Sequence, residues 1–168
     1  MSVINTKIKP FKTQAYKQGK FIEVSEQDAF LLRTLLIHGA HCAFLWAGDS
    51  RLYRWRRGWL QQLSADHSKV TEYVKLGLIT ASEANSHPDG NLITRAVGAA
   101  PNLRLECNVE ALEVGDRFLL CTDGLSGVLR HDEIATLLVD GDATGAVTRL
   151  VEAALERGAP DNVTVVVA

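Results

Sequence analysis

The stretch Leu119-Leu120-Cys121-Thr122-Asp123-Gly124-Leu125 runs from an apolar strand into an Asp-Gly turn, and two further aspartates occupy similar places. Asp49 follows the apolar run His41–Ala47, and Asp161 stands just before the apolar run Val163–Val167. Because strand ends meet at the edge of a sheet, we expect the three carboxylates to lie together. Carboxylate oxygens are the ligands that hard divalent cations prefer. The pattern therefore makes Asp49, Asp123 and Asp161 candidates for a metal site.

A second interpretation of these aspartates stays open, because Asp-Gly, Gly-Asp and Pro-Asp-Asn are ordinary turn sequences. Taken singly, each aspartate fits a turn better than a metal site, and sequence spacing alone does not reverse that preference. In the metal interpretation, two cations about 3.5–4 Å apart would activate a water and clamp a phosphoryl group.

The 168 residues are 46% hydrophobic and 23% charged, with a formal net charge of −2. These values predict one globular domain with a real core, and a charge near zero argues against nucleic-acid binding. The longest uncharged apolar stretch, Thr34–Gly48, is too short for a membrane span, and the first residues lack the apolar core of a signal peptide. Three scattered cysteines without a C-x-x-C pair favour a reducing, cytoplasmic compartment.

The remaining pattern is one of short strands joined by tight turns, with helices grouped together, which is typical of an α+β fold around antiparallel sheets. The expected strands are Lys9–Tyr16, Lys20–Val24, His41–Ala47, Leu52–Trp55, Trp59–Leu63, Leu103–Val109, Arg117–Cys121 and Val163–Val167; the expected helices are 68–86, Asp132–Val139 and Ala143–Arg157. The apolar run Ala29–Ile37 leaves helix and strand open, although Ser25-Glu26-Gln27-Asp28 before it resembles a helix-capping box.

Several other polar residues are interpreted as structural. The arginines of the second hairpin are expected to form its solvated face above Trp55 and Trp59, and binding of an acidic partner there is the less favoured alternative. These arginines are Arg51, Arg54, Arg56 and Arg57. His67 and His87 are expected in turns, and Arg95 is a candidate to approach a phosphate, although the sequence does not place it.

Five segments, in this order, resemble the PPM family of type 2C metal-dependent protein serine/threonine phosphatases. They are Trp46–Tyr53, Ser64–Ser68, Ile93–Gly98, Leu119–Leu125 and Ala159–Thr164. The resemblance covers residues 34–168 and is nearest to bacterial members. The segments around Ala43–Tyr53 and Asn91–Ala100 are similar to phosphatases associated with type VI secretion.

The resemblance implies a fold, a reaction and a set of ligands. The fold would be part of an αββα sandwich of antiparallel sheets with flanking helices, and residues 68–90 would form a flap that contributes to substrate choice. Asp123 and Asp161 would bind one metal of a binuclear Mn²⁺ or Mg²⁺ pair, and Asp49 with Asp123 would help to hold a further metal. A metal-activated water would hydrolyse phosphoserine or phosphothreonine, on proteins that a cognate kinase of type VI secretion control phosphorylates.

The chain lacks the front motifs that complete members of this family carry. Those members open with an Arg-x-x-Asn-Glu-Asp-like segment and continue with Asp-Gly-x-Gly-Gly, which together supply the metal-bridging acids. Before Asp49 the only acids are Glu23, Glu26 and Asp28, and none has that setting. We therefore expect impaired catalysis, with an inactive remnant or regulatory binding module as the alternative. Missing strands would also expose sheet edges and inner faces such as Ala43–Trp46 and Val163–Val167, and so favour oligomerisation.

The opening Met1–Asp28 resembles the start of the peroxidase component of alkyl hydroperoxide reductase, a typical two-cysteine peroxiredoxin. The match covers only the predicted opening hairpin, and no Phe-Val-Cys-Pro-like segment with the peroxidatic cysteine follows. Peroxidase activity is therefore not implied. The sequence predicts a chimeric chain, in which residues 1–28 meet a truncated phosphatase domain, 34–168, at a junction near 28–33.

Overall fold

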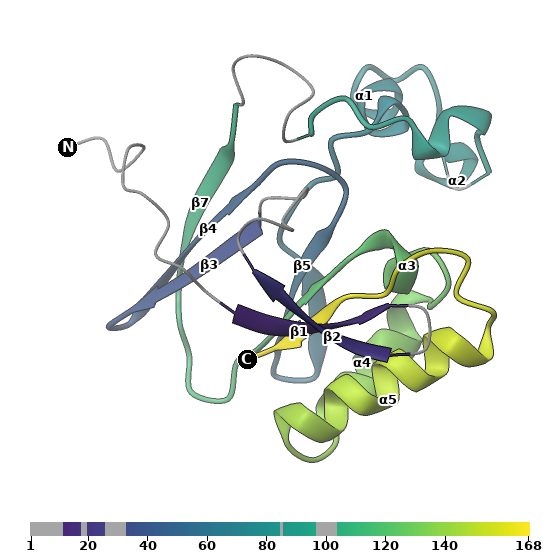
Figure 1. Cartoon of the computed structure of the whole chain (residues 1–168). Coiled ribbons are helices and arrows are strands. Elements are labelled where there is room, and N and C mark those ends of the chain that lie inside the picture. Colours follow the sequence, from purple (N-terminus) through teal and green to yellow (C-terminus); the bar gives the residue numbers. More distant parts are fainter. Residues whose placement is uncertain (1–11, 18–19, 26–32, 85, 97–103) are drawn as a thin grey trace.

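The computed structural model describes residues 12–17, 20–25, 33–84, 86–96 and 104–168. Their strands form antiparallel sheets of two, three and four strands. The three-stranded and four-stranded sheets pack face to face, and helices α3–α5 lie on the far side of the four-stranded sheet (Figure 1). The α+β prediction is thus confirmed, with three antiparallel sheets and a layer of helices against the four-stranded sheet in the described part of the chain.

The four-stranded sheet has the order β6-β5-β8-β9. Its strands are β5 (Arg51–Arg56), β6 (Trp59–Gln62), β8 (Arg117–Cys121) and β9 (Val165–Val167). The β5–β6 hairpin turns at Arg57 and Gly58, which both have positive φ. Two successive positive φ angles match the right-handed twist of the paired strands. The predicted hairpin is confirmed, and β9 begins two residues later than expected.

The three-stranded sheet has the order β3-β4-β7, with β3 at Arg33–His38, β4 at His41–Trp46 and β7 at Glu106–Ala111. The sequence left helix and strand open for the apolar run 29–37. Its described residues, 33–37, are strand. Ser25 ends a strand, and the rest of the predicted capping box, 26–28, lies outside the described residues.

Two hydrophobic cores hold the layers together. Between the sheets, Phe44, Trp46, Leu52 and Phe118 are buried against one another. The second core fills the space between the four-stranded sheet and the helices α3 (Asp123–Ser126), α4 (His131–Val139) and α5 (Ala143–Glu156). Burial of such apolar area is the main stabilising contribution to the fold.

Helix α5 shows how the sequence specifies its own place. It buries one stripe at helical spacing, consisting of Ala146, Leu150, Val151 and Ala154. The side chain of Asp142 accepts the Gly145 N–H at 2.9 Å and caps the first turn. Gly158 follows the last turn with φ 87°, a left-handed conformation that favours glycine. The predicted span of this helix is confirmed to within one residue.

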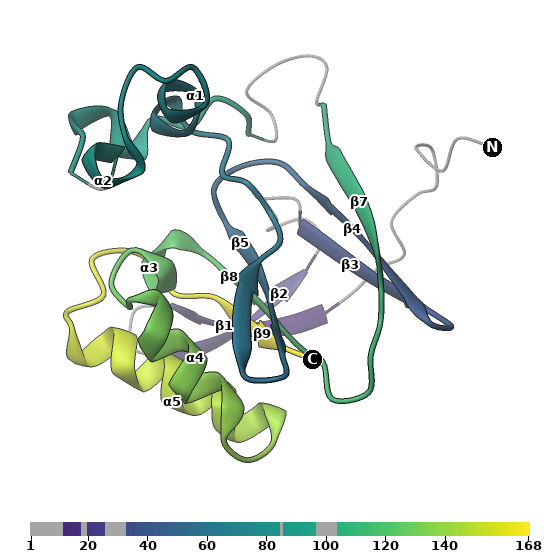
Figure 2. The same ribbon diagram turned by 180° about the vertical axis from the view of Figure 1, so that it is seen from behind.

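Residues 68–93 project away from the packed sheets, as Figure 2 shows for α1 and α2. This segment contains α1 (Lys69–Lys75), α2 (Ala81–Ala84) and a 3₁₀ turn at Pro88–Asn91. The prediction of helix over 68–86 is confirmed in two parts, α1 and α2, and Gly77, with φ 70°, lies between them. An isolated β-bridge between Ser68 and Ile93 closes the base of the segment.

The remaining strands, β1 (Lys12–Lys17) and β2 (Lys20–Ser25), pair with each other and form a two-stranded sheet of their own. The predicted opening hairpin is therefore confirmed in the described residues. No helix in the described part of the chain is both long enough and apolar enough to cross a membrane.

The expectation of exposed inner faces is confirmed only in part. The face at 43–46 is covered, since Phe44 is 1% exposed, and Val163 is also 1% exposed, but Val166 is 37% exposed. Exposed apolar surface lies as well on the outer face of the three-stranded sheet, where Leu36 is 51% and Val109 is 58% exposed. These two residues flank Ala43 in the same cross-strand row, so they form one continuous surface.

The hairpin arginines are also not a free solvated face. Arg54 is buried and pairs with Glu110 at 3.0 Å, and Arg56 pairs with Asp116 at 2.6 Å. Arg51 pairs with Asp66 at 2.8 Å. The partners of Arg54 and Arg56 lie on β7 and the loop after it, so these pairs join the two sheets. Trp59, expected to pack beneath the arginines, is 73% exposed.

Candidate metal centre

The first of the three aspartates stands in the loop that carries the chain from one sheet to the other. Asp49 lies between β4 and β5, directly after Gly48, whose φ is 112°. Only glycine adopts this backbone conformation without strain, so Gly48 allows the sharp change of direction. Asp49 is half-buried, and the next side chain, Ser50, is buried with its hydroxyl oxygen unpartnered among the described residues.

Asp123 stands where β8 ends and the short helix α3 begins. Its carboxylate accepts the N–H of Gly124 at 2.9 Å. A Cβ on Gly124 would lie 2.4 Å from the carbonyl oxygen of Asn162, so only a glycine lets the Asp161–Asn162 loop come this close. The Asp-Gly pair thus places Asp123 against the loop that carries Asp161.

The Asp161 loop is fixed by backbone and hydroxyl contacts with Thr122. The Thr122 hydroxyl donates to the carbonyl of Asn162 at 2.9 Å and accepts the N–H of Thr164 at 3.0 Å. Asp161 itself is exposed, and its carboxylate accepts the N–H of Asn162 at 2.6 Å. The exposed carboxylate therefore sits on a rigid support at the entrance to β9.

The three carboxylates share one electrostatic environment. Partial burial raises the pKa of Asp123 above its ordinary value, and the negative charges of Asp49 and then Asp161 raise it further. The charges of Asp49 and Asp161 therefore both disfavour ionisation of Asp123. Among the described residues, however, no three Asp, Glu, His or Cys side chains are close enough together to hold a metal ion.

These observations give a mixed answer on the fit of a divalent cation. The donor chemistry fits, because carboxylate oxygens suit Mn²⁺ and Mg²⁺ and mutual repulsion favours a bound cation. The number of donors within reach does not fit, because the described residues bring too few of them together. The roles of Asp49, Asp123 and Asp161 as metal ligands therefore stay a prediction.

Sequence reasoning missed a second polar group beside Asp49. His67 is buried and its ring Nδ1 accepts the N–H of Gly48 at 3.1 Å, while its Nε2 lies 3.2 Å from Glu106. Arg95, which had no predicted partner, pairs with the same carboxylate at 3.0 Å. The sequence marked His67 as a turn residue, but nothing in it indicated Glu106, which lies 39 residues further on.

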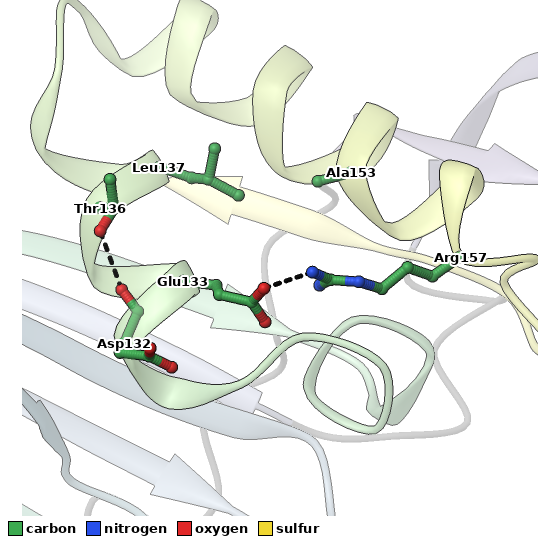
Figure 3. Close-up of a pocket in the computed structure, with 6 residues that line it drawn as sticks. All are labelled: Asp132, Glu133, Thr136, Leu137, Ala153 and Arg157. Carbon is green, nitrogen blue, oxygen red and sulfur yellow. Dashed lines mark hydrogen bonds and ion pairs between the residues drawn. The ribbon is translucent and has the colours of Figure 1, made fainter.

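A hollow of about 330 Å³ lies elsewhere, between α4 and α5, and contains none of the three aspartates (Figure 3). It is lined by Asp132, Glu133, Thr136, Leu137, Ala153 and Arg157. Glu133 and Arg157 form an ion pair within it. The hollow is therefore separate from the candidate metal centre, and its charged groups are already paired.

Comparisons with known proteins give consistent relatives. The chain is 39% identical over 137 residues to the serine/threonine protein phosphatase PstP of Mycobacterium tuberculosis, and 38% identical over 119 residues to a putative protein phosphatase 2C-type of Streptococcus pyogenes. These matches cover 82% and 70% of this chain, but only 26% and 48% of those proteins. No protein-family model matches the chain.

Solved structures show the same relationship. The PstP phosphatase structure from M. tuberculosis superposes with a TM-score of 0.78 at 38% identity, covering 84% of this chain and 62% of that one. PppA, described as a regulatory component of type VI secretion in Pseudomonas aeruginosa, gives 0.74 at 42% identity, covering 82% and 56%. The PstP catalytic domain with two manganese ions gives 0.73 at 36% identity, covering 84% and 60%. The chain thus spans less than two thirds of each relative.

Proposed function

We propose that this chain forms the Asp49–Asp123–Asp161 side of a phosphatase site. The premise is that the chain is related over most of its length to the PPM (type 2C) protein serine/threonine phosphatases. The reaction is hydrolysis of phosphoserine and phosphothreonine in proteins. The observation that carries the proposal is the shared field of these three aspartates, in a chain 36–42% identical to bacterial phosphatase structures.

The proposed metal is Mn²⁺ or Mg²⁺, with Asp49, Asp123 and Asp161 as ligands. Support comes from their oxygen donors and from the two manganese ions in the related PstP catalytic domain. Because the described residues supply too few donors for a complete site, we propose that this chain alone is an impaired enzyme. The specific alternative is an inactive remnant or regulatory binding module, which the same shortage favours.

The deciding experiment measures release of phosphate from a phosphothreonine peptide by the purified full chain, with and without Mn²⁺. Slow, Mn²⁺-dependent turnover that Asp123→Asn abolishes is the expected result. Asp140→Asn is the matched control, because this aspartate is exposed at the end of α4, away from the site. Equal, negligible rates in all three proteins, with and without metal, would contradict the phosphatase and support the inactive binding module.

The proposed substrate is a phosphoprotein of a cognate serine/threonine kinase in the control of type VI secretion. PppA, at 42% identity, is the relative that supports this assignment. Residues 68–90 are proposed as the flap that contributes to substrate choice, and their projection from the sheets places them at the surface (Figure 2). A cytoplasmic location is proposed because all three cysteines are free.

We also propose that the chain is chimeric, with a peroxiredoxin-like segment at 1–28 and a truncated phosphatase domain at 34–168. Two observations support this division. The matches to relatives extend over 135 and 137 residues, which is about the length from residue 34 to Ala168. In addition, β1 and β2 pair only with each other among the described strands.

Oligomerisation through the three-stranded sheet is the last part of the proposal. In the described part of the chain, β3 and β7 are the edge strands of this sheet, and open edges pair readily with a second copy. Its outer face is apolar beside those edges, with Leu36 and Val109 exposed. The occupant we propose is therefore another copy of this chain.

A further inference from the structure

The buried histidine next to the Asp49 loop makes contacts in three directions. The ring of His67 stacks on Trp46, with the ring centroids 6.2 Å apart and the planes 9° from parallel. The His67 N–H donates to the carbonyl of Gly48 at 3.0 Å, and the Gly48 N–H donates to His67 Nδ1 at 3.1 Å. This reciprocal pair fixes both the backbone and the ring of His67 to the residue directly before Asp49.

The direction of the Gly48 hydrogen bond determines the tautomer of the ring. Because Nδ1 accepts a hydrogen bond from the Gly48 N–H, the neutral imidazole carries its own proton on Nε2. Nε2 lies 3.2 Å from Glu106 on β7, so it donates to that carboxylate. Nδ1 on the ring edge of His67 thus contacts the residue before Asp49, and Nε2 on the same edge contacts Glu106.

The base of the projecting segment meets the same residue. The Thr94 N–H donates to the His67 carbonyl at 2.7 Å, and the bridge between Ser68 and Ile93 lies immediately beyond. On the return side of the segment, Arg95 pairs with Glu106 at 3.0 Å. Both ends of the segment are therefore connected to His67, directly or through Glu106.

From this arrangement we infer that His67 is a positioning residue that couples the orientation of segment 68–93 to that of the Asp49 loop. Displacement of the segment moves Arg95 and the Glu106 carboxylate, and Glu106 acts on the His67 ring. The ring then acts on the Gly48 amide and so on the backbone of Asp49. Groups that hold a ligand in place from behind control its orientation in this way. The functional meaning of the coupling rests on Asp49 being a metal ligand, but the coupling itself does not.

A double-mutant cycle tests the coupling in the full chain, with hydrogen–deuterium exchange of the Gly48 amide as the readout. Arg95→Met removes the contact with Glu106, and we expect exchange at Gly48 to rise by about tenfold. His67→Asn keeps an acceptor near the Nδ1 position for the Gly48 N–H but cannot reach Glu106. In that background Arg95→Met is expected to leave the Gly48 amide unchanged.

Lys69→Met is the matched control for Arg95→Met, because it removes a positive charge from the exposed side of α1 in the same segment. It should leave exchange at Gly48 unchanged in both backgrounds. His67→Gln provides the complementary readout, since its longer amide reaches Glu106 but leaves the Gly48 N–H unpartnered, and exchange there should rise.

An equal rise at Gly48 from Arg95→Met in both backgrounds, or no rise in the parent chain, would overturn the inference. If His67→Asn does not fold, Glu106→Ala takes the place of His67→Asn in the cycle. This variant removes the same contact between His67 and Glu106, and Glu106 is only half-buried. Exchange is measured without metal or substrate. An inactive chain therefore overturns the proposed phosphatase but not the coupling.

Discussion

At the scale of single residues, the candidate site depends on close approach more than on charge. Gly124 lies so near the Asn162 carbonyl that no side chain fits between them. The same contact brings the Asp161 loop beside Asp123. A side chain in place of one hydrogen on the Gly124 Cα would therefore affect both the stability of the fold and the arrangement of the carboxylates.

We predict that Gly124→Ala destabilises the chain by about 1–3 kcal/mol, because the new Cβ forces the backbone of the Asp161–Asn162 loop to move. Urea unfolding followed by circular dichroism measures the change. Gly90→Ala is the matched control, since its added Cβ meets no atom within 4 Å. Equal urea midpoints for the two variants would contradict the prediction, because they would show that the Asp161–Asn162 loop moves without loss of stability.

The sequence indicated the three aspartates as candidate site residues because each stands next to an apolar strand, and strand ends meet at sheet edges. It did not predict how many ligands would come together, because distances between loops depend on packing such as that at Gly124. The contacts of His67 could not be predicted from the sequence either. Its partners Gly48 and Glu106 lie 19 and 39 residues away, and no local pattern connects them.

At the scale of elements, the ends of the two sheets are joined by ion pairs. Arg56 on β5 donates two hydrogen bonds to Asp116, at 2.6 Å each, and Asp116 also accepts the N–H of Glu113 at 2.9 Å. This geometry ties the β5–β6 hairpin to the loop between β7 and β8. The hydrogen bonds from Arg56 hold the pKa of Asp116 below its ordinary value, although burial opposes them.

We therefore predict that Asp116→Asn lowers the melting temperature by several degrees at pH 7. A carboxylate with a lowered folded-state pKa stabilises the fold above its unfolded pKa of 3.8, and this contribution is lost as the pH falls through the lowered value. The difference between the parent chain and the variant should accordingly shrink below pH 3.8. Thermal unfolding across pH 2–7 measures it, with the exposed Asp140→Asn as control. A difference that stays constant with pH contradicts an ionic role.

Elements with strong alternation or helical spacing were predictable, and elements that depend on distant partners were not. Alternating apolar residues gave the β5–β6 hairpin, and a buried stripe gave α5. The helix α3 escaped prediction because its four residues contain no helical repeat. Arg54 and Arg56 were assigned to solvent because their acidic partners lie 56–60 residues away along the chain.

At the scale of the whole molecule, the layers are unequal. The four-stranded sheet is covered on both faces, by the other sheet and by α3–α5 (Figure 1). The three-stranded sheet is covered on one face only by the described residues. The register places Thr34, Leu36, Ala43, Leu45 and Val109 on its outer face, and none of these residues is charged.

We predict that the chain self-associates and that Leu36→Asp shifts it toward the monomer, because a charge on the outer face disfavours burial against a second copy. Light scattering coupled to size-exclusion chromatography measures the mass. Leu76→Asp is the matched control, since Leu76 is also an exposed leucine but lies at the end of α1. A monomeric parent chain, or equal masses for the two variants, would contradict the assignment of this face.

The uncovered face also has a thermodynamic consequence. Unfolding raises the heat capacity in proportion to the apolar surface that it newly exposes to water, and the denaturant dependence of the unfolding free energy scales in the same way. Leu36 and Val109 are already in contact with water in the folded monomer. The stability curve of the monomer is therefore flatter with temperature, and less steep with denaturant, than that of a fully covered domain of 168 residues.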